Sequence, residues 1–448
     1  MTESVRDDAR PGAVAKRGLL RILGVGFGLA VIVGSTLGIG ILRTPGLVAG
    51  QLSSRSSILA VWLVGGLYTL LGSVCLTELG TMLPQAGGYY VYARRAFGDT
   101  VGFAVGWSDW ITYCAVLGYV TIAMGEFTAA LAPSLAPATK PVAVGVLVLF
   151  AGLQWAGVRV SSRFQEATTA IKSLAFLALV VACFAHALSA PLPGGEARAG
   201  SPAAGFVGLV VALQSVAITY GGWQSALYFT EEDRDPRQNL PRSMIGGVLS
   251  VLVIYMLVNV ALLAVLPIPE LARSTLPAAD AAKAIFGEGG GRLITALSLV
   301  SLPPLVNAIM MIGTRILFAM GRDGLVWPAA AVVGDRGTPV HATLVTAAVA
   351  AGLIASGTFQ KLVAVASFFL ALNYVVCCLA LVVLRRREPE QERPFRAWGY
   401  PFSAVVVLAG ATAFLVGVLL GDTRTALVAL GLLAGGLVGR KWMSPRRS

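Results

Sequence analysis

The sequence predicts an all-α integral membrane protein with twelve transmembrane helices. Apolar blocks recur from end to end of the 448 residues, and a block of about 18 or more apolar residues crosses the bilayer hydrocarbon as a helix. Hydrophobic residues make up 56% of the chain and charged residues only 12%, whereas soluble domains carry about 25% charged residues. The blocks are apolar on all faces, which argues against the alternating strands of a membrane β-barrel.

The predicted spans leave only tails and short loops outside the membrane. They cover residues 22–49, 57–83, 100–131, 141–157, 163–187, 204–230, 243–266, 293–320, 341–357, 361–384, 402–420 and 424–440. Residues 1–21 and 441–448 form terminal tails, and no loop is long enough for an independent catalytic domain. The first span is too long for a signal-peptide core, so we expect no cleavable signal.

The net charge of +12 is distributed in a way that predicts topology. Twelve spans place both chain ends on one side of the membrane. Most of the 34 Lys and Arg residues fall on that side, including the run Arg385–Arg387 and the basic residues of both tails. The positive-inside rule therefore predicts a multi-pass protein of the plasma (inner) membrane with both termini in the cytoplasm. The basic excess is thus explained without a nucleic-acid partner.

Residue types that carry metal or catalytic chemistry are scattered along the chain. The five cysteines all fall inside spans and are interpreted as small apolar residues: Cys75, Cys114, Cys183, Cys377 and Cys378. His186 and His341 stand near span ends without Cys or carboxylate patterns around them. We therefore expect no metal and no cofactor. An enzyme is not expected either, because no nucleophile and base cluster at one depth.

Two spans contain glycine clusters near their middle, at Gly34–Gly40 and at Thr219–Gln224. Each glycine costs a helix interior roughly 1 kcal/mol relative to alanine, so these clusters favour unwinding. Unwound backbone at membrane depth is tolerated only inside protein or beside a cavity. The two spans are five helices apart and therefore run in opposite directions, as in inverted-repeat transporters. The alternative is close helix packing through small residues.

These residues also carry a family resemblance. The chain resembles the amino acid–polyamine–organocation superfamily, and within it the L-amino-acid transporter branch. The matching motifs follow in order: Gly34–Leu42 with Thr44-Pro45, Thr77–Thr81 with Gly87–Tyr92, Tyr220–Leu227 with Thr230–Glu232 and Asn239–Arg242, Arg315–Gly324 with Thr338-Pro339, and Arg393–Phe395 with Gly399–Pro401. The resemblance implies a LeuT-type fold, with a first repeat at 22–187, an inverted second repeat at 204–384, and two further helices at 402–440.

The resemblance implies a secondary active transporter that carries amino acids, in particular neutral L-amino acids, by alternating access. A cationic amino acid or polyamine permease is the alternative within the class, and a channel or sensor is less favoured. The chain departs from the family pattern at Ile39, where Ser or Thr is usual, at Ile218, where an aromatic gate is common, and at Gln224, where Asn is usual. The outer loop at 133–140 lacks the cysteine by which some members bind a heavy-subunit glycoprotein, so we expect no such partner and place a monomer first.

An amino acid substrate presents a carboxylate and an ammonium group. The amides of Gly38, Ile39 and Gly40 open the second half of the first span, where free N–H groups favour an anion. The carbonyls from Ala217 to Tyr220 precede the other break and can accept from the ammonium. Ser35 and Thr36 add hydroxyls, unless these bond to helix carbonyls instead. Further candidates for the lining of the substrate site are Ile218, Gly221, Trp223, Gln224, Asn307, Asn373 and Tyr374.

Asn373 and Tyr374 resemble the Asn-Trp pair of the family, whose asparagine lies near substrate. An interhelical hydrogen bond is the alternative role for Asn373.

Ionisable residues inside spans are candidates for function. Lys172 lies near the middle of the span 163–187 and resembles the family pattern T-x-x-K, whose ammonium takes the place of a coupling sodium ion. Carbonyls around Gly34–Leu37 are its expected partners, and transport is then sodium-independent, by exchange or coupled to protons. Alternatively, Lys172 merely satisfies the carbonyls that end a helix.

The acidic residues leave several roles open. Asp109 faces a cavity or pairs with a neighbour, and the sequence does not choose between them. Glu78 is expected to pair with a basic loop residue. Glu231 and Glu232 belong to a solvated loop or to a salt bridge at an inner gate.

Overall fold

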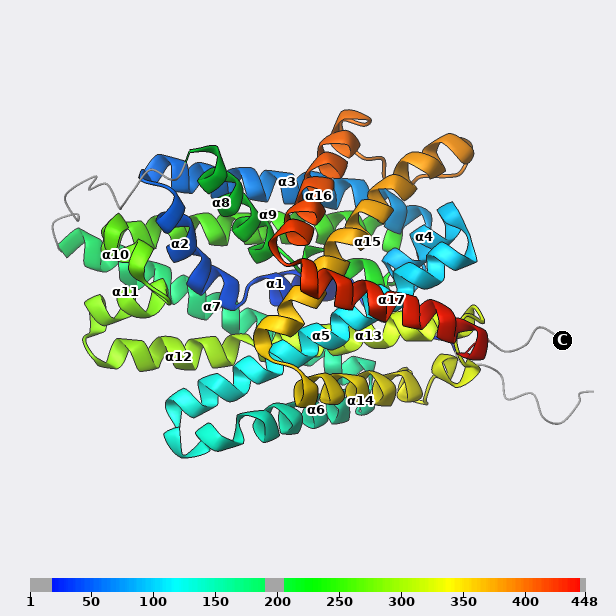
Figure 1. Ribbon diagram of the computed structural model, residues 1–448, viewed down its shortest axis with the longest axis horizontal. Helices are drawn as coiled ribbons and strands as arrows, with labels where there is room; N and C mark the ends of the chain where they lie inside the picture. The colour runs from blue at the N-terminus through cyan, green and yellow to red at the C-terminus, as the bar shows by residue number, and fades with distance from the viewer. Residues whose placement is uncertain (1–17, 190–204, 444–448) are drawn as a thin grey trace, which may run out of the picture.

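The computed structural model describes residues 18–189 and 205–443. The predicted tails at 1–21 and 441–448 lie mostly outside this part. Helices account for the regular structure of the described residues, apart from one isolated bridge between Leu23 and Asp233. Many helices run along the long axis of the molecule, among them α3, α5, α13 and α17 in Figure 1. The all-helical fold class is therefore confirmed.

Nine helical segments of the described chain are long and apolar enough to cross a membrane, or ten if one bent pair counts as a single span. The segments of regular α-helix among them are α3 (Arg55–Met82), α5 (Asp99–Leu131), α6 (Thr139–Trp155), α7 (Val158–Ser189), α9 (Pro236–Val265), α15 (Phe359–Arg387) and α16 (Phe402–Gly421). Helices also form at the predicted spans 341–357 and 424–440, as α14 (Val340–Ser356) and α17 (Thr423–Met443). The total of twelve spans stays a prediction.

Both glycine-rich spans are interrupted, as the sequence predicts. The first consists of α1 (Val25–Thr36) and α2 (Ile39–Gln51), which meet at an angle of 46°. The second consists of α8 (Phe206–Thr219) and the 3₁₀ helix η2 (Trp223–Phe229). Breaks at both positions are the feature that an inverted repeat requires, although the repeat itself stays a prediction.

A one-residue junction at Leu302 lies within the predicted span 293–320. The helix α12 (Gly289–Ser301) ends just before α13 (Pro303–Arg322). Pro303 and Pro304 follow the junction, and a proline supplies no amide to the preceding turn and clashes with its carbonyl. Leu302 nevertheless keeps a right-handed helical conformation, and Gly289–Arg322 is long and apolar enough to form a single span, so the predicted span 293–320 is confirmed.

Short helices occupy the connections. They are α4 (Tyr89–Phe97), η1 (Pro133–Ala138), α10 (Ile268–Arg273), α11 (Pro277–Phe286) and η3 (Pro328–Ala331). The helix α11 buries Ala278, Ala281 and Ala282 and packs against α12 and α2.

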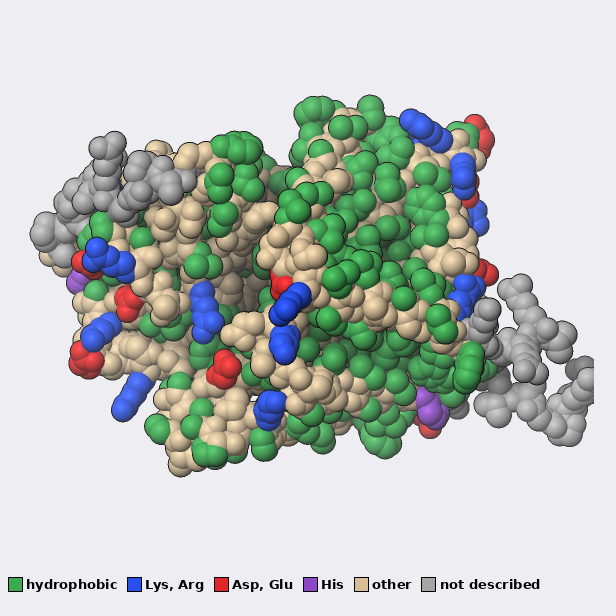
Figure 2. Space-filling model, in the orientation of Figure 1, with side chains coloured by type: hydrophobic (Ala, Val, Ile, Leu, Met, Phe, Trp, Pro, Cys, Tyr) green, Lys and Arg blue, Asp and Glu red, His purple; other side chains and the backbone are tan. Residues whose placement is uncertain are grey.

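The helix α1 lies at the centre of the bundle. It packs against α9, α7, α13 and η2, and nine of its twelve residues are buried. Hydrophobic side chains cover the right-hand half of the face in Figure 2, while charged side chains gather at its right edge and across its left-hand half. The interruption in the first span is therefore surrounded by protein, which is where the bilayer tolerates it.

Candidate functional site

The first break leaves a helix N-terminus without a side-chain cap. Leu37 and Gly38 have extended backbone conformations, and no side-chain hydrogen bond caps α2 at Gly38. The first amides of an α-helix have no partner within the helix, and the helix dipole adds partial positive charge there. The amides of Ile39 and Gly40 thus form a small anion-binding end at the centre of the bundle.

The second break touches the first, backbone against backbone. Gly222 has φ +114°, and a Cβ atom added to it would lie 2.7 Å from the carbonyl carbon and oxygen of Ser35. A Cβ atom on Gly40 would lie 3.0 Å from Thr219 Cγ2. Only glycine fits such approaches. The sequence-predicted residues of the two breaks are therefore brought together.

Tyr255 of α9 links the two breaks. Its hydroxyl lies 2.7 Å from the carbonyl oxygen of Thr36 and 2.9 Å from that of Thr219. A tyrosine hydroxyl carries one proton, so it donates to one of these carbonyls at a time. The sequence analysis missed this residue. A signal existed, because a tyrosine inside an apolar span needs a hydrogen-bond partner, and the carbonyls freed by the breaks are suitable.

The hydroxyls of Ser35 and Thr36 are buried and have no hydrogen-bond partner. The alternative in which they bond to helix carbonyls is therefore not what the structure contains. A buried polar group without a partner costs about 1–3 kcal/mol. Two such groups beside free helix amides are well placed to bind a polar ligand.

Lys172 reaches the first break from α7. Its Nζ atom donates to the carbonyl oxygen of Gly34 at 2.9 Å, a contact that both sequence interpretations of this lysine predict. Gln165 and Thr169, on the same face of α7, donate to the carbonyl oxygen of Ala30 at 3.3 and 3.0 Å. A side chain at position 34 would meet both of them within 2.5 Å, so glycine permits this approach.

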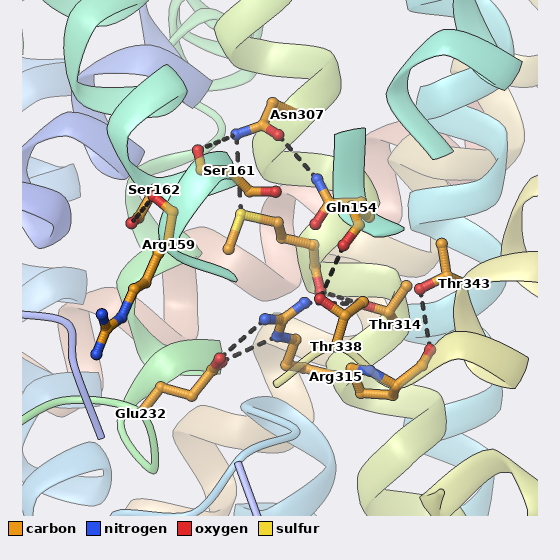
Figure 3. A network of polar contacts seen from close by, with 12 residues as sticks. Gln154, Arg159, Ser161, Ser162, Glu232, Asn307, Thr314, Arg315, Thr338 and Thr343 are labelled. Carbon is orange, nitrogen blue, oxygen red and sulfur yellow. Dashed lines mark hydrogen bonds and ion pairs between the residues drawn. The ribbon is translucent and has the colours of Figure 1, made fainter. Parts of the chain in front are cut away.

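Asn307 belongs to this polar network. It donates to the carbonyl of Ser161 at 3.1 Å and accepts from Gln154 at 2.8 Å (Figure 3). It also donates to Gln165 Oε1 at 2.9 Å. These bonds tie α13 to α6 and α7. The residue does not line the cavity described next, so the expectation that it faces the substrate side chain is not supported.

A mainly apolar cavity of about 340 Å³ lies between α3, α8, η2, α15 and α16. Six of the predicted substrate-site residues line it: Ala217, Ile218, Gly221, Trp223, Gln224 and Tyr374. Trp223 packs edge-on against Tyr374, with ring centroids 5.6 Å apart. The predicted residues of the first break do not line this cavity. The predicted residues of the second break either line the cavity or are buried beside it. Tyr220 is one of the buried residues, and its hydroxyl donates to the carbonyl of Trp62 at 3.2 Å.

Asn373 and Asp109 make contacts between helices. The Asn373 side chain accepts a hydrogen bond from Ser108 at 2.8 Å, which is the interhelical alternative left open by the sequence. Asp109 is fully buried and accepts from the Tyr228 hydroxyl at 2.8 Å. Asp109 therefore pairs with a neighbour and does not line the cavity.

Ion pairs close the end of the bundle that follows η2. Arg315 donates to both oxygens of Glu232 at 2.9 and 2.8 Å, and both side chains are fully buried (Figure 3). Glu231 pairs with Arg322 at 2.6 Å. The solvated-loop interpretation was thus wrong for Glu232, and the salt-bridge interpretation is the one the structure contains.

Glu78 has the basic loop partner that was predicted. It contacts Arg393 at 3.2 Å and Arg385 at 2.8 Å, and it also accepts from the amide of Ala397. Among the described residues no group of three or more His, Cys, Asp or Glu side chains is arranged to hold a metal ion.

A membrane-embedded helical bundle in which two interrupted helices meet at the centre is the arrangement of secondary transporters. The comparison with known sequences agrees with this class. The chain belongs to the amino acid permease family, which matches residues 28–435. The resemblance to the amino acid–polyamine–organocation superfamily is therefore confirmed, and a family of transporters argues against an enzyme.

Similar proteins carry amino acids according to their names. The serine/threonine exchanger SteT of Bacillus subtilis (strain 168) is 27% identical over 96% of this chain and 98% of its own length. The Asc-type amino acid transporter 1 of Homo sapiens is 28% identical over 86% of this chain and 75% of its own length. The b(0,+)-type amino acid transporter 1 of Mus musculus is 27% identical over 89% of this chain and 82% of its own length.

Proposed function

We propose that the protein is a secondary active transporter that carries neutral L-amino acids by alternating access without sodium, either by exchange or with protons. The observation that carries the proposal is the meeting of the two interrupted helices. There the free amides of α2 lie beside the unpartnered hydroxyls of Ser35 and Thr36. A zwitterion needs donors and acceptors close together, and this junction offers both.

The two charged groups of the substrate bind to the two breaks. The amides of Ile39 and Gly40, with Gly38 open to close approach, hold the carboxylate. At the other break the amide of Gly221 bonds to the carbonyl of Ile218 at 3.0 Å, whereas a regular helix would direct it to Ala217. The carbonyl of Ala217 therefore does not bond to the amide of Gly221. It is our first candidate to accept a hydrogen bond from the substrate ammonium.

The surroundings favour a neutral substrate. The cavity beside η2 has an apolar lining with a few hydroxyl and amide groups and includes no acidic residue. Asp109, the acid that was considered for a cationic side chain, is engaged with Tyr228. A cationic amino acid or polyamine remains the alternative substrate class, and a channel or sensor the alternative outside it.

Lys172 supports independence from sodium. Its ammonium group is completely buried and lies on the carbonyl of Gly34 at the end of α1. A tethered cation at this position supplies the positive charge that a bound ion would otherwise bring to the freed carbonyls.

We further propose that the protein is a multi-pass component of the plasma (inner) membrane with cytoplasmic termini. The loop that contains η1 carries no cysteine, so the transporter is expected to act without a heavy-subunit glycoprotein, as a monomer.

Uptake by purified protein in liposomes tests the function. Liposomes loaded with unlabelled L-alanine, L-serine, L-threonine or L-leucine should take up the same amino acid in labelled form by counterflow. Liposomes loaded with unlabelled L-arginine or putrescine should take up the labelled form of that compound more slowly. Replacing sodium by choline should change the rate less than twofold. Lys172→Ala should lose at least about tenfold, while Lys361→Ala, at an exposed lysine, should not.

Three outcomes contradict parts of this proposal. Stronger transport of arginine supports the cationic alternative. Flux without saturation or counterflow supports a channel. A clear sodium requirement, or full activity of Lys172→Ala, removes the lysine from the mechanism.

A further inference from the structure

Three carboxylates are completely buried among the described residues, namely Glu78, Asp109 and Glu232. Glu232 is paired with Arg315. Glu78 is paired with Arg385 of α15 and with Arg393 of the loop that follows α15. Asp109 is the exception. One of its oxygens accepts from the Tyr228 hydroxyl at 2.8 Å, and the other has no hydrogen-bond partner.

The groups that face Asp109 leave its charge uncompensated. The titratable side chains are Tyr89 on α4, Tyr113 on α5, Tyr228 on η2 and Cys377 on α15. The helix α13 also packs against α5, but its buried cation is held by Glu232. An isolated ionised carboxylate is so costly in an apolar interior that the group takes up a proton instead. Asp109 is therefore the one of the three buried carboxylates without an arginine partner.

A series of side-chain contacts leads from the cavity to this carboxyl. Gln224 lines the cavity and donates to the Tyr113 hydroxyl at 3.5 Å. The Tyr113 ring packs edge-on against the Tyr228 ring, with centroids 5.4 Å apart, and Tyr228 donates to Asp109. Gln224 and Tyr228 both belong to η2, the segment that directly follows the break in the second interrupted span. A movement of η2 therefore alters the surroundings of the acid.

We propose that Asp109 is the proton-binding site through which amino acid uptake is driven by a proton gradient. This inference rests on the transport function proposed above. One proton from water on the outer side binds the carboxylate while the site is open outward. When η2 shifts relative to α5 and water enters from the other side, the O–H bond breaks and the same proton leaves to the cytoplasm with the substrate. The carboxylate is regenerated for the next cycle.

The test is accumulation of the best neutral amino acid of the panel in liposomes with the membrane potential clamped at zero. With the lumen one pH unit more alkaline than the outside, a symporter of one proton per substrate accumulates its substrate up to about tenfold. Asp109→Asn preserves the shape of the side chain but cannot release a proton. Its accumulation ratio should fall to about one, while exchange at equal pH continues. Glu126→Gln, an exposed position on the same helix, serves as the matched control and should accumulate as the wild type does.

A second variant separates coupling from structure. Tyr228→Phe keeps the carboxyl, so accumulation should persist, but loss of the hydroxyl should displace the pH at which accumulation is half-maximal. Accumulation by Asp109→Asn equal to that of the wild type overturns the inference, and so does an unchanged pH profile in Tyr228→Phe. Wild-type exchange without any accumulation in a pH gradient also overturns it and leaves the transport function standing. Absence of exchange for the whole panel contradicts the transport function itself.

Discussion

Single glycines determine how closely the two interrupted helices approach. Gly222 combines a positive φ with backbone contact to Ser35, and Gly34 allows α7 to bring Gln165 and Thr169 against α1. Gly38 differs, since its backbone is extended and the nearest atom to an added Cβ is 3.9 Å away, on Leu305. Packing therefore does not require glycine at position 38, which leaves local unwinding of the helix and close approach of a ligand as reasons for it.

Gly38→Ala should test the carboxylate site with little effect on folding. The added methyl group fits the protein but points into the space from which a substrate carboxylate approaches α2, so affinity should fall about tenfold or more, a loss of about 1.4 kcal/mol. Binding measured by scintillation proximity reports this loss. Gly24→Ala is the matched control, because Gly24 also precedes a helix, is extended, and has open space around it. Ile39→Ser should be tolerated. Unchanged affinity of Gly38→Ala would refute the placement of the carboxylate.

Gly222→Ala should damage the fold as well as transport. Alanine is strained at φ +114°, and its methyl group would overlap the Ser35 carbonyl, so the stability should fall by at least about 1–3 kcal/mol. Thermal unfolding in detergent measures the loss. Gly145→Ala, on a helix with nothing within 4 Å of the added atom, should be neutral or slightly stabilising. Wild-type stability and transport of Gly222→Ala would show that the two breaks separate without cost.

At the scale of elements, polar contacts tie the segments around the two breaks to neighbouring helices. Tyr255 of α9 holds the ends of α1 and α8, the amide network around Asn307 joins α13 to α7, and Arg315 of α13 holds the segment after η2. Each contact joins an interrupted span to an uninterrupted helix or to α13. The proposed alternating access requires that the contacts at one end of the bundle open before the substrate leaves there.

The Glu232–Arg315 pair should be strongly coupled. Removal of one partner leaves a buried charge alone, so Glu232→Gln or Arg315→Met should each cost about 3–5 kcal/mol of stability. The double variant should regain a large part of that loss, because no lone charge remains. Unfolding midpoints of the four proteins measure the coupling. Glu392→Gln breaks an exposed pair with Arg237 and should cost less than about 1 kcal/mol. Additive losses in the double variant would contradict the coupling.

At the scale of the whole molecule, both described chain ends lie at the same end of the bundle. Leu19 packs in a cluster with Ala86, Phe318 and Val333. At the other terminus, Arg440 of α17 donates to Thr100. The neighbouring residue, Asp99, pairs with Arg94. Arg94 also pairs with Asp323, which lies just after α13. This arrangement is compatible with the even number of crossings that the sequence predicts.

Reporter fusions determine the orientation. A green fluorescent protein fused at Ser448 should fluoresce, and alkaline phosphatase at the same position should be inactive, because the positive-inside rule predicts a cytoplasmic C-terminus. A truncated fusion after Gly287, in a loop predicted to face outward, is the control and should show the reverse pattern. Active phosphatase at Ser448 would contradict the predicted topology.

The sequence by itself determined the class of fold, because long apolar blocks with few charges have no other stable arrangement than membrane helices. It also located both breaks, since clustered glycines weaken a helix locally whatever surrounds them. The partner of Lys172 followed from the resemblance and from the carbonyls that the break releases. These features depend on neighbours along the chain or on composition alone.

Only the tertiary structure decided which polar side chains meet. The bridge made by Tyr255, the pairing of Glu232 with Arg315, the place of Asn307 outside the cavity, and the contact of Asp109 with Tyr228 join residues far apart in sequence. Whether such residues touch depends on the rotation and tilt of each helix. Spans that are apolar on all faces carry little amphipathic pattern to indicate that rotation, so packing against the other helices sets it.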